Sequence, residues 1–153
     1  MQKIIVKTKI NSPCVKVRSI LWEIKYWTNF WIPTHNVNVL YDDTLHQDFS
    51  MSLDWQTSST YIRTVRFLNE QGNITFFSPT PPPPMTLHQG LWELTPENDQ
   101  ITELTAIRFF TIPLSENETL KEYEKRLNDF SQGFVVRLEK LLKCLGELCE
   151  SST

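Results

Sequence analysis

The sequence is poor in the residues that several classes of function require. Only 4 of its 153 residues are glycine, which leaves little material for the glycine-rich loops that cradle phosphates. The formal net charge is -3, and a chain without a surplus of basic residues is poorly suited to a nucleic-acid backbone. No apolar run approaches the roughly 20 residues needed to cross a bilayer. We therefore expect no nucleic-acid partner and no membrane span.

Cysteine and histidine are also scarce. Cys14, Cys144 and Cys149 form no C-x-x-C pair, so they fit neither a zinc framework nor a disulfide scaffold. The three histidines are far apart in the sequence, which argues against a metal site, and we expect no cofactor. Unpaired thiols fit a reducing compartment, and the N-terminus alternates with lysines and lacks an apolar signal segment. We therefore expect a cytoplasmic protein.

Aromatic residues, in contrast, are abundant. The chain has 5 Trp, 9 Phe and 4 Tyr. Each such side chain can bury roughly 150–250 Å². Composition alone leaves two interpretations open, a densely aromatic core or a cavity lined by aromatic rings.

The spacing of apolar residues predicts strands first and a long helix last. Residues 3–10 alternate as a half-buried strand, and Ser12 and Pro13 are typical of a helix start. A second short helix is expected over 26–31. From residue 36 the period is two, which predicts strands over 36–41, 48–55, 60–69, 73–77, 86–95 and 101–112. Apolar residues then recur every three or four positions, which predicts a helix over 116–148 with Ser115 and Glu118 as a capping box.

These elements predict an α+β domain over residues 1–153. The expected architecture is a curved antiparallel sheet of about seven strands around a long C-terminal helix, with two short helices after the first strand. Such a sheet leaves a space beside the helix, which is the default ligand site. The run Pro81–Pro84 interrupts the strands, and a stiff loop is favoured over a ligand for a proline-reading domain.

Several short motifs resemble the START-like SRPBCC superfamily. Its opening is similar to Ile10-x-Ser12-Pro13 and to Trp27-(x)3-Trp31-x-Pro33, and its late strand pair is similar to Gly90-x-Trp92-Glu93-Leu94 followed by Thr102-x-Leu104-Thr105. The resemblance covers the whole chain and implies the helix-grip fold. The likeness is greatest to bacterial polyketide aromatase/cyclases, which implies a cavity that folds a carrier-tethered poly-β-keto chain for aldol cyclisation and dehydration.

This resemblance implies roles for particular residues. Arg66 falls where these enzymes have an arginine that points into the cavity. Their cavity tyrosine falls at Thr34, beside His35, and tryptophans of the arginine strand fall at Thr60 and Ile62. The pocket is therefore expected to be built differently from those of the family.

The residues themselves support candidates for chemistry. Alternation places Arg66 on one face with Ile62 and Thr64, where an arginine indicates a wet cavity. The alternatives are an arginine on the solvent side of the sheet and one in a structural ion pair. An arginine is a poor base, so its role would be to stabilise an enolate. His35 has the side chain best suited to proton transfer, and a surface loop histidine is the alternative.

A second group of residues is expected to line the cavity. Arg108 lies in register with Leu104, Ala106 and Phe110 on an otherwise apolar face, so it is either a second inward cation or the partner of a buried acid. His88 alternates with Trp92 and could reach the same space. The full set of expected lining residues is Trp31, Thr34, Trp55, Ile62, Thr64, His88, Trp92 and Arg108. Further aromatic candidates are Trp27, Phe49, Tyr61, Phe76 and Phe110.

Three functions remain open from the sequence. The first is a cofactor-free polyketide cyclase/aromatase with Arg66 and His35 as its reactive side chains and an acyl carrier protein as a possible partner. The second is a non-enzymatic carrier of a hydrophobic ligand such as a lipid or quinone. The third is an adaptor that uses the outside of the sheet. The sequence leaves open whether the chain is a monomer or a homodimer.

Overall fold

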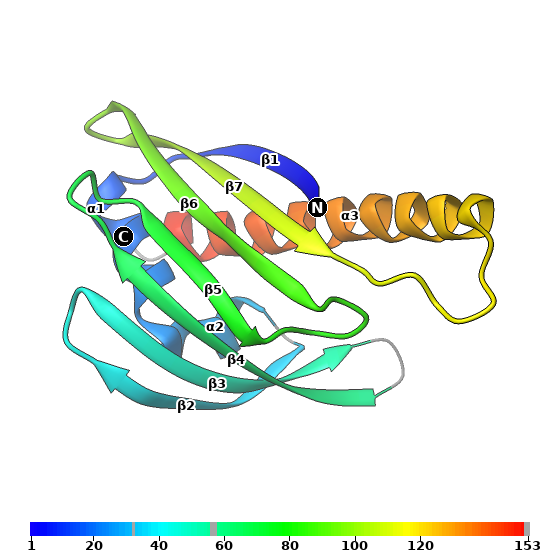
Figure 1. The fold of residues 1–153 in the computed structure, drawn as a ribbon. Helices are drawn as coiled ribbons and strands as arrows, with labels where there is room; N and C mark the ends of the chain where they lie inside the picture. Colours follow the sequence, from blue (N-terminus) through cyan, green and yellow to red (C-terminus); the bar gives the residue numbers. More distant parts are fainter. Residues whose placement is uncertain (32, 56–57, 152–153) are drawn as a thin grey trace.

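Seven antiparallel strands form one curved sheet, and a long helix crosses one of its faces (Figure 1). The computed structural model describes residues 1–31, 33–55 and 58–151, apart from the side chain of Trp55. In chain order the elements are β1 (Gln2–Ile10), α1 (Cys14–Trp22), the 3-10 turn η1 (Ile24–Tyr26), α2 (Trp27–Phe30), β2 (Thr34–Asp42), β3 (His46–Trp55), β4 (Ser58–Leu68), β5 (Ile74–Thr80), β6 (Leu87–Asn98), β7 (Ile101–Thr111) and α3 (Leu120–Ser151).

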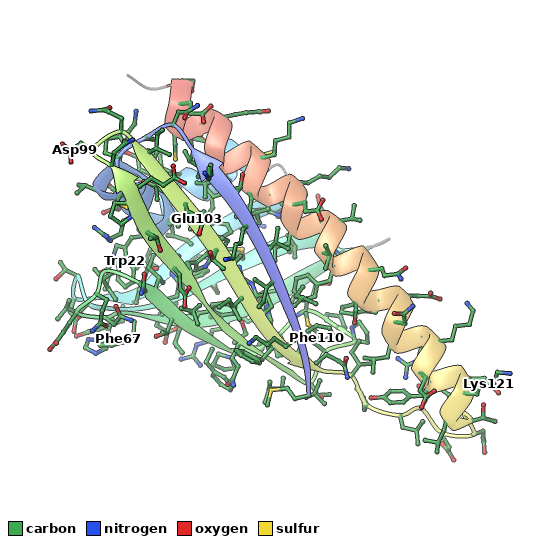
Figure 2. The ribbon with its side chains drawn as sticks, turned by 90° about the horizontal axis from the view of Figure 1, so that it is seen from above. Trp22, Phe67, Asp99, Glu103, Phe110 and Lys121 are labelled. Atoms are coloured by element: carbon green, nitrogen blue, oxygen red, sulfur yellow. The ribbon has the colours of Figure 1, made fainter. Side chains whose placement is uncertain are left out.

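The strand order is β1-β7-β6-β5-β4-β3-β2, so the first two strands of the chain form the two edges of the sheet. Helix α3 packs mainly along β1, and its first turns extend past the end of the sheet near Lys121 (Figure 2). The helix-grip arrangement predicted from the sequence is therefore confirmed. No helix within the described parts of the chain is both long and apolar enough to cross a membrane.

Neither predicted capping residue, Ser12 or Ser115, caps its helix, although one bond of the predicted capping box forms. Pro13 itself occupies the cap position of α1, and the buried hydroxyl of Ser12 has no hydrogen-bond partner among the described residues. Helix α3 begins four residues later than predicted because Thr119 caps it, accepting a hydrogen bond from the backbone N–H of Glu122 at 3.1 Å. Glu118 Oε1 does accept a hydrogen bond from the backbone N–H of Ser115 at 3.0 Å, but this bond forms ahead of the helix. Glu118 is also held by Arg126, with Nε–Oε2 and Nη2–Oε1 distances of 2.8 Å.

Strand β5 is longer than its pattern predicts. It was expected over 73–77 but continues to Thr80, because Pro79 lies opposite a bulge between Arg63 and Val65 where its missing N–H disrupts no ladder bond. The prolines that follow form the connection to β6, as expected for a stiff loop. Pro82 is buried and reaches the interior of the protein.

The buried apolar residues form two separate clusters. The larger one joins α1 and α3 to β1, β6 and β7, with Leu104, Phe110 and Leu145 fully buried. The smaller one contains Ile24, Phe49, Met51 and Ile62, from η1, β3 and β4. Members of both clusters line one cavity, so the cavity lies where the two halves of the core fail to meet.

Gly90 allows the close approach of two central strands. A Cβ atom built on Gly90 would lie 2.0 Å from the main-chain oxygen of Ile107 on β7, which cannot move without breaking the sheet. We expect Gly90→Ala to lower the free energy of unfolding by about 2 kcal/mol in urea denaturation.

Gly133 in α3 is a matched control for this prediction. A Cβ there meets no atom within 4 Å beyond its chain neighbours and the backbone of its own helix, so Gly133→Ala should stabilise the protein by about 1 kcal/mol through helix propensity. Equal effects of the two substitutions would contradict the close-approach argument.

Candidate functional site

The cavity has a volume of about 200 Å³ and lies between the sheet and α3. Its wall is mostly apolar and aromatic, with a few polar groups that face inward. The lining residues are Trp27, Trp31, Pro33, Thr34, Phe49, Met51, Leu53, Asp54, Ile62, Thr64, Arg66, Phe76, Ser78, Pro82, Met85, His88, Trp92, Arg108, Phe134, Arg137, Leu138 and Leu141. Rings, a few polar groups and partial enclosure are the usual features of a small-molecule site.

Arg108 is a buried cation in this wall. Its side chain is only 5% exposed, and its guanidinium lies between the rings of Trp92 and Phe76, at 4.2 and 4.6 Å from their centroids. Its Nη1 donates to the backbone oxygens of Ile107, at 3.0 Å, and Leu91, at 3.5 Å. No carboxylate pairs with it among the described residues, and burial lowers its pKa to about 9.

His88 lies beside Arg108 on the inner face of β6. Its ring packs edge-on against Phe76 and Phe134, with centroid distances of 5.0 and 5.6 Å. Neither ring nitrogen has a hydrogen-bond partner in the described part of the chain. Burial, and secondarily the charge of Arg108, lower the pKa of His88 to about 3. The imidazole is therefore neutral at pH 7, with one donor and one acceptor that no described residue satisfies.

The lowered pKa of His88 predicts loss of stability in mild acid. An unfolded histidine takes up a proton near pH 6.5, whereas folded His88 does so only near pH 3, so the stability that its neutral form supplies is lost as pH falls through this window. Between pH 7 and 5 this amounts to about 2 kcal/mol. His88→Phe should remove that part of the pH dependence in urea denaturation. If the free energy of unfolding of the variant falls between pH 7 and 5 as steeply as that of the wild-type protein, His88 is not the cause of the pH dependence.

Arg66 is also buried, but its guanidinium is held by the protein. It is 4% exposed, Nη1 donates to the Leu21 carbonyl at 2.7 Å, and Nη2 donates to the Trp22 carbonyl at 2.6 Å. Nε donates to Oε1 of Gln47 at 2.9 Å, and Nη2 donates to the same oxygen. The charge also lies over the rings of Trp22 and Phe49. Burial lowers the pKa of Arg66 to about 9, while Asp42 and Glu23 oppose that shift.

These bonds occupy four of the five N–H groups of Arg66. They join β4 to the last turn of α1, whose carbonyls have no partner within the helix. Arg66 borders the cavity, as the sequence predicts, but its hydrogen bonds are of the kind expected for a structural residue. Stabilisation of an enolate by Arg66 stays a prediction.

His35 lies at the edge of the cavity and does not line it. Its Nε2 is 3.0 Å from Oδ1 of Asp54, which does line the cavity, and 3.4 Å from Oγ of Ser59. Its Nδ1 is buried without a partner among the described residues. The adjacent Thr34 is 3% exposed and lines the cavity, and its hydroxyl also has no such partner. Proton transfer by His35 stays a prediction.

The remaining predicted residues divide between the cavity and other places. Trp31, Ile62, Thr64 and Trp92 all line the cavity, and the Thr64 hydroxyl is hydrogen-bonded to that of Ser78 at 2.9 Å. The side chain of Trp55 lies outside the described residues. The expectation for Tyr61 is wrong, because the alternation that turns Ile62 inward leaves Tyr61 55% exposed on the outer face. Phe110 is fully buried in the larger core cluster and is not part of the cavity wall.

Sequence reasoning missed the contribution of α3. Arg137 lines the cavity, and its guanidinium lies 5.7 and 5.8 Å from the ring centroids of Phe130 and Phe134. Its position, three residues after Phe134 and four before Leu141, places it on the apolar stripe of the helix. A charged residue on that stripe is the signal that could have identified it.

Solved structures of other proteins share this fold. The Zhui aromatase/cyclase from Streptomyces sp. R1128 superposes with a TM-score of 0.84 at 16% identity, covering 97% of this chain and 93% of that one. A START superfamily protein from Mycobacterium smegmatis gives 0.76 at 13% identity, covering 99% of both. A STAR-related lipid transfer protein from Xanthomonas axonopodis gives 0.69 at 14% identity, covering 97% and 85%.

At the level of sequence, no family model and no curated protein matches this chain. With identities this low, the structural likeness establishes the START-like fold alone. Any function must therefore be argued from the cavity of this chain.

Proposed function

We propose that this protein is a cofactor-independent cyclase that folds a short poly-β-keto chain in its cavity and promotes aldol ring closure and dehydration. The observation that supports it most directly is a pair of inward-facing polar side chains, the buried Arg108 and the half-buried His88, set in an aromatic wall. Flat rings suit the product, and a buried cation suits the enolate that forms when a proton leaves the carbon between two carbonyls. The likeness of fold to an aromatase/cyclase supports the same reaction class.

The size of the cavity favours a compact substrate. At about 200 Å³ it is smaller than the roughly 300–1,000 Å³ of sites for drug-sized ligands. A chain of four ketide units, the shortest that can close a six-membered ring by an aldol step, suits it better than a long chain. Holding the chain in a bent conformation could supply several kcal/mol of the barrier by proximity alone. An acyl carrier protein as the donor of that chain stays a prediction.

Within this proposal the two buried arginines have different roles. Arg108 contacts the developing enolate oxygen, and neutral His88 donates or accepts one hydrogen bond beside it. Arg66 positions α1 against the sheet, because most of its donors already bind carbonyl oxygens. His35 and Asp54 lie together at the rim, where a proton could be exchanged with solvent.

The test is to incubate the purified protein with tetraketide thioesters and compare the products with those of spontaneous cyclisation. We expect faster closure and a narrower set of products. Identical rates and product ratios with and without protein would overturn the proposal.

The second candidate is a carrier of a hydrophobic ligand, which the mostly apolar wall favours. Native mass spectrometry separates the two: a tightly retained hydrophobic molecule in the purified protein, together with no effect on cyclisation, would favour the carrier.

A further inference from the structure

One edge of the Arg108 guanidinium is open. All hydrogen bonds that Arg108 makes with described residues start from Nη1. The Nε–H and the Nη2–H groups, which together form a planar two-pronged donor, have no acceptor among those residues. Arg108 is nevertheless buried, with an exposed fraction of only 5%. An arginine edge of this kind matches an oxygen anion that accepts both hydrogen bonds.

The surroundings of this edge fix the shape of a ligand. The rings of Trp92 and Phe76 both pack against the guanidinium, so the two-pronged donor formed by Nε–H and Nη2–H cannot rotate freely. His88 contacts the same Phe76 ring and has two unpartnered ring nitrogens. Phe134 of α3 also packs edge-on against His88. A flat ligand would therefore lie among these rings with its anionic oxygen at Arg108 and a second polar atom at His88.

The charges of the cavity wall also favour an anionic ligand. Three guanidinium groups line it, on Arg66, Arg108 and Arg137. Asp54 is the single carboxylate in the described lining, and it is already paired with His35 at the rim. The hydrogen bonds of Arg66 leave Arg108 as the better-placed donor for a ligand.

We propose that the inner end of the cavity is a binding site for a small planar compound that carries a delocalised oxygen anion, with the Nε/Nη2 edge of Arg108 as its anchor and a ring nitrogen of His88 as its second contact. This inference rests on the proposed function, for which it names the ligand class. The anion can be a carboxylate, which offers one oxygen to each N–H, or an enolate, which offers one oxygen to both.

The experiment measures affinity by isothermal titration calorimetry for two matched pairs of probes. Benzoate and benzamide represent a carboxylate and its neutral isostere. The anion of 4-hydroxy-6-methyl-2-pyrone and the neutral 4-methoxy-6-methyl-2-pyrone do the same for an enolate. We expect the wild-type protein to bind at least one anion tenfold or more tightly than its neutral partner, and the pair that shows this preference identifies the source of the charge.

Three variants locate the preference. Arg108→Lys keeps a charge but removes the fork, and should weaken anion binding about tenfold, whereas Arg108→Gln should abolish the preference. Arg63→Gln, on the outer face of β4, should change nothing, because Arg63 is bonded to Asp48 away from the cavity. Equal affinity for anion and neutral isostere in the wild-type protein, or a preference that persists in Arg108→Gln, would overturn the inference.

Failures of the two proposals are distinguishable. An anion preference without accelerated cyclisation supports the anion-binding site and contradicts the proposed cyclase activity. Accelerated cyclisation without an anion preference contradicts only the proposed role of Arg108 as the anchor. If circular dichroism shows that neither Arg108 variant folds, the wild-type comparison of charged and neutral probes still tests whether the cavity prefers an anion.

Discussion

Arg66→Met is expected to lower the free energy of unfolding by about 3 kcal/mol, which for a chain of this size corresponds to roughly 6–12 °C in Tm. Methionine fills much of the same space against Trp22 and Phe49 but donates no hydrogen bond. Oε1 of Gln47 would lose both of its partners within the buried network. The carbonyls of Leu21 and Trp22 would keep one donor each, from Trp27 and Gln47. A buried acceptor without a partner costs about 1–3 kcal/mol, and the lost charged bonds add to this.

Urea denaturation monitored by tryptophan fluorescence measures this effect. Arg63→Met is the matched control: it lies on the same strand but faces outward with its side chain 41% exposed, so its transition midpoint should barely move. A double-mutant cycle with Gln47→Leu adds a second check, because the partners share one network and the combined loss should be smaller than the sum of the single losses. Additive losses would contradict a direct coupling between Arg66 and Gln47.

The fold could be predicted from the sequence because periodicity reports burial directly. Ile62, Thr64 and Arg66 share a face by alternation, and all three are buried in the structure. The long C-terminal helix is equally visible in its apolar stripe. Helix ends were less predictable, since Thr119 and Ser115 are both acceptable caps, and the bond between Ser115 and Glu118 forms although Thr119 caps the helix.

The candidate site was only partly predictable for a different reason. Alternation indicates that an arginine points inward, but it does not indicate what the arginine meets there. Two of the partners of Arg66 come from α1, whose last carbonyls lie 44 and 45 residues earlier in the chain, and the third is Gln47 of β3. Arg108 has the same sequence signature and meets two rings and an open cavity. Tertiary contacts, which no local pattern contains, separate a structural cation from one available to a ligand.

Arg108→Met should therefore have the opposite effect on stability. The carbonyls that Arg108 contacts belong to the paired strands β6 and β7. Removing the guanidinium therefore leaves no carbonyl at a helix end without a hydrogen-bond donor. It does remove a buried charge that has no carboxylate partner among the described residues, and whose desolvation is reflected in its lowered pKa. Methionine packs well between aromatic rings such as Trp92 and Phe76. We expect the free energy of unfolding to rise by about 2 kcal/mol, as when other buried ionic groups are replaced by apolar ones.

The same substitution should weaken binding of an anionic ligand about 100-fold, equivalent to roughly 2.7 kcal/mol, because two charged hydrogen bonds are lost. Tm and ligand affinity, measured on one preparation, check both expectations together, and Arg66→Met is the internal comparison. A gain in stability coupled to a loss of binding is the mark of a residue kept for its ligand at the expense of the fold. If Arg108→Met instead destabilises the protein as Arg66→Met does, Arg108 is a structural cation, and the anion site must be sought elsewhere in the wall, with Arg137 as the next guanidinium to replace.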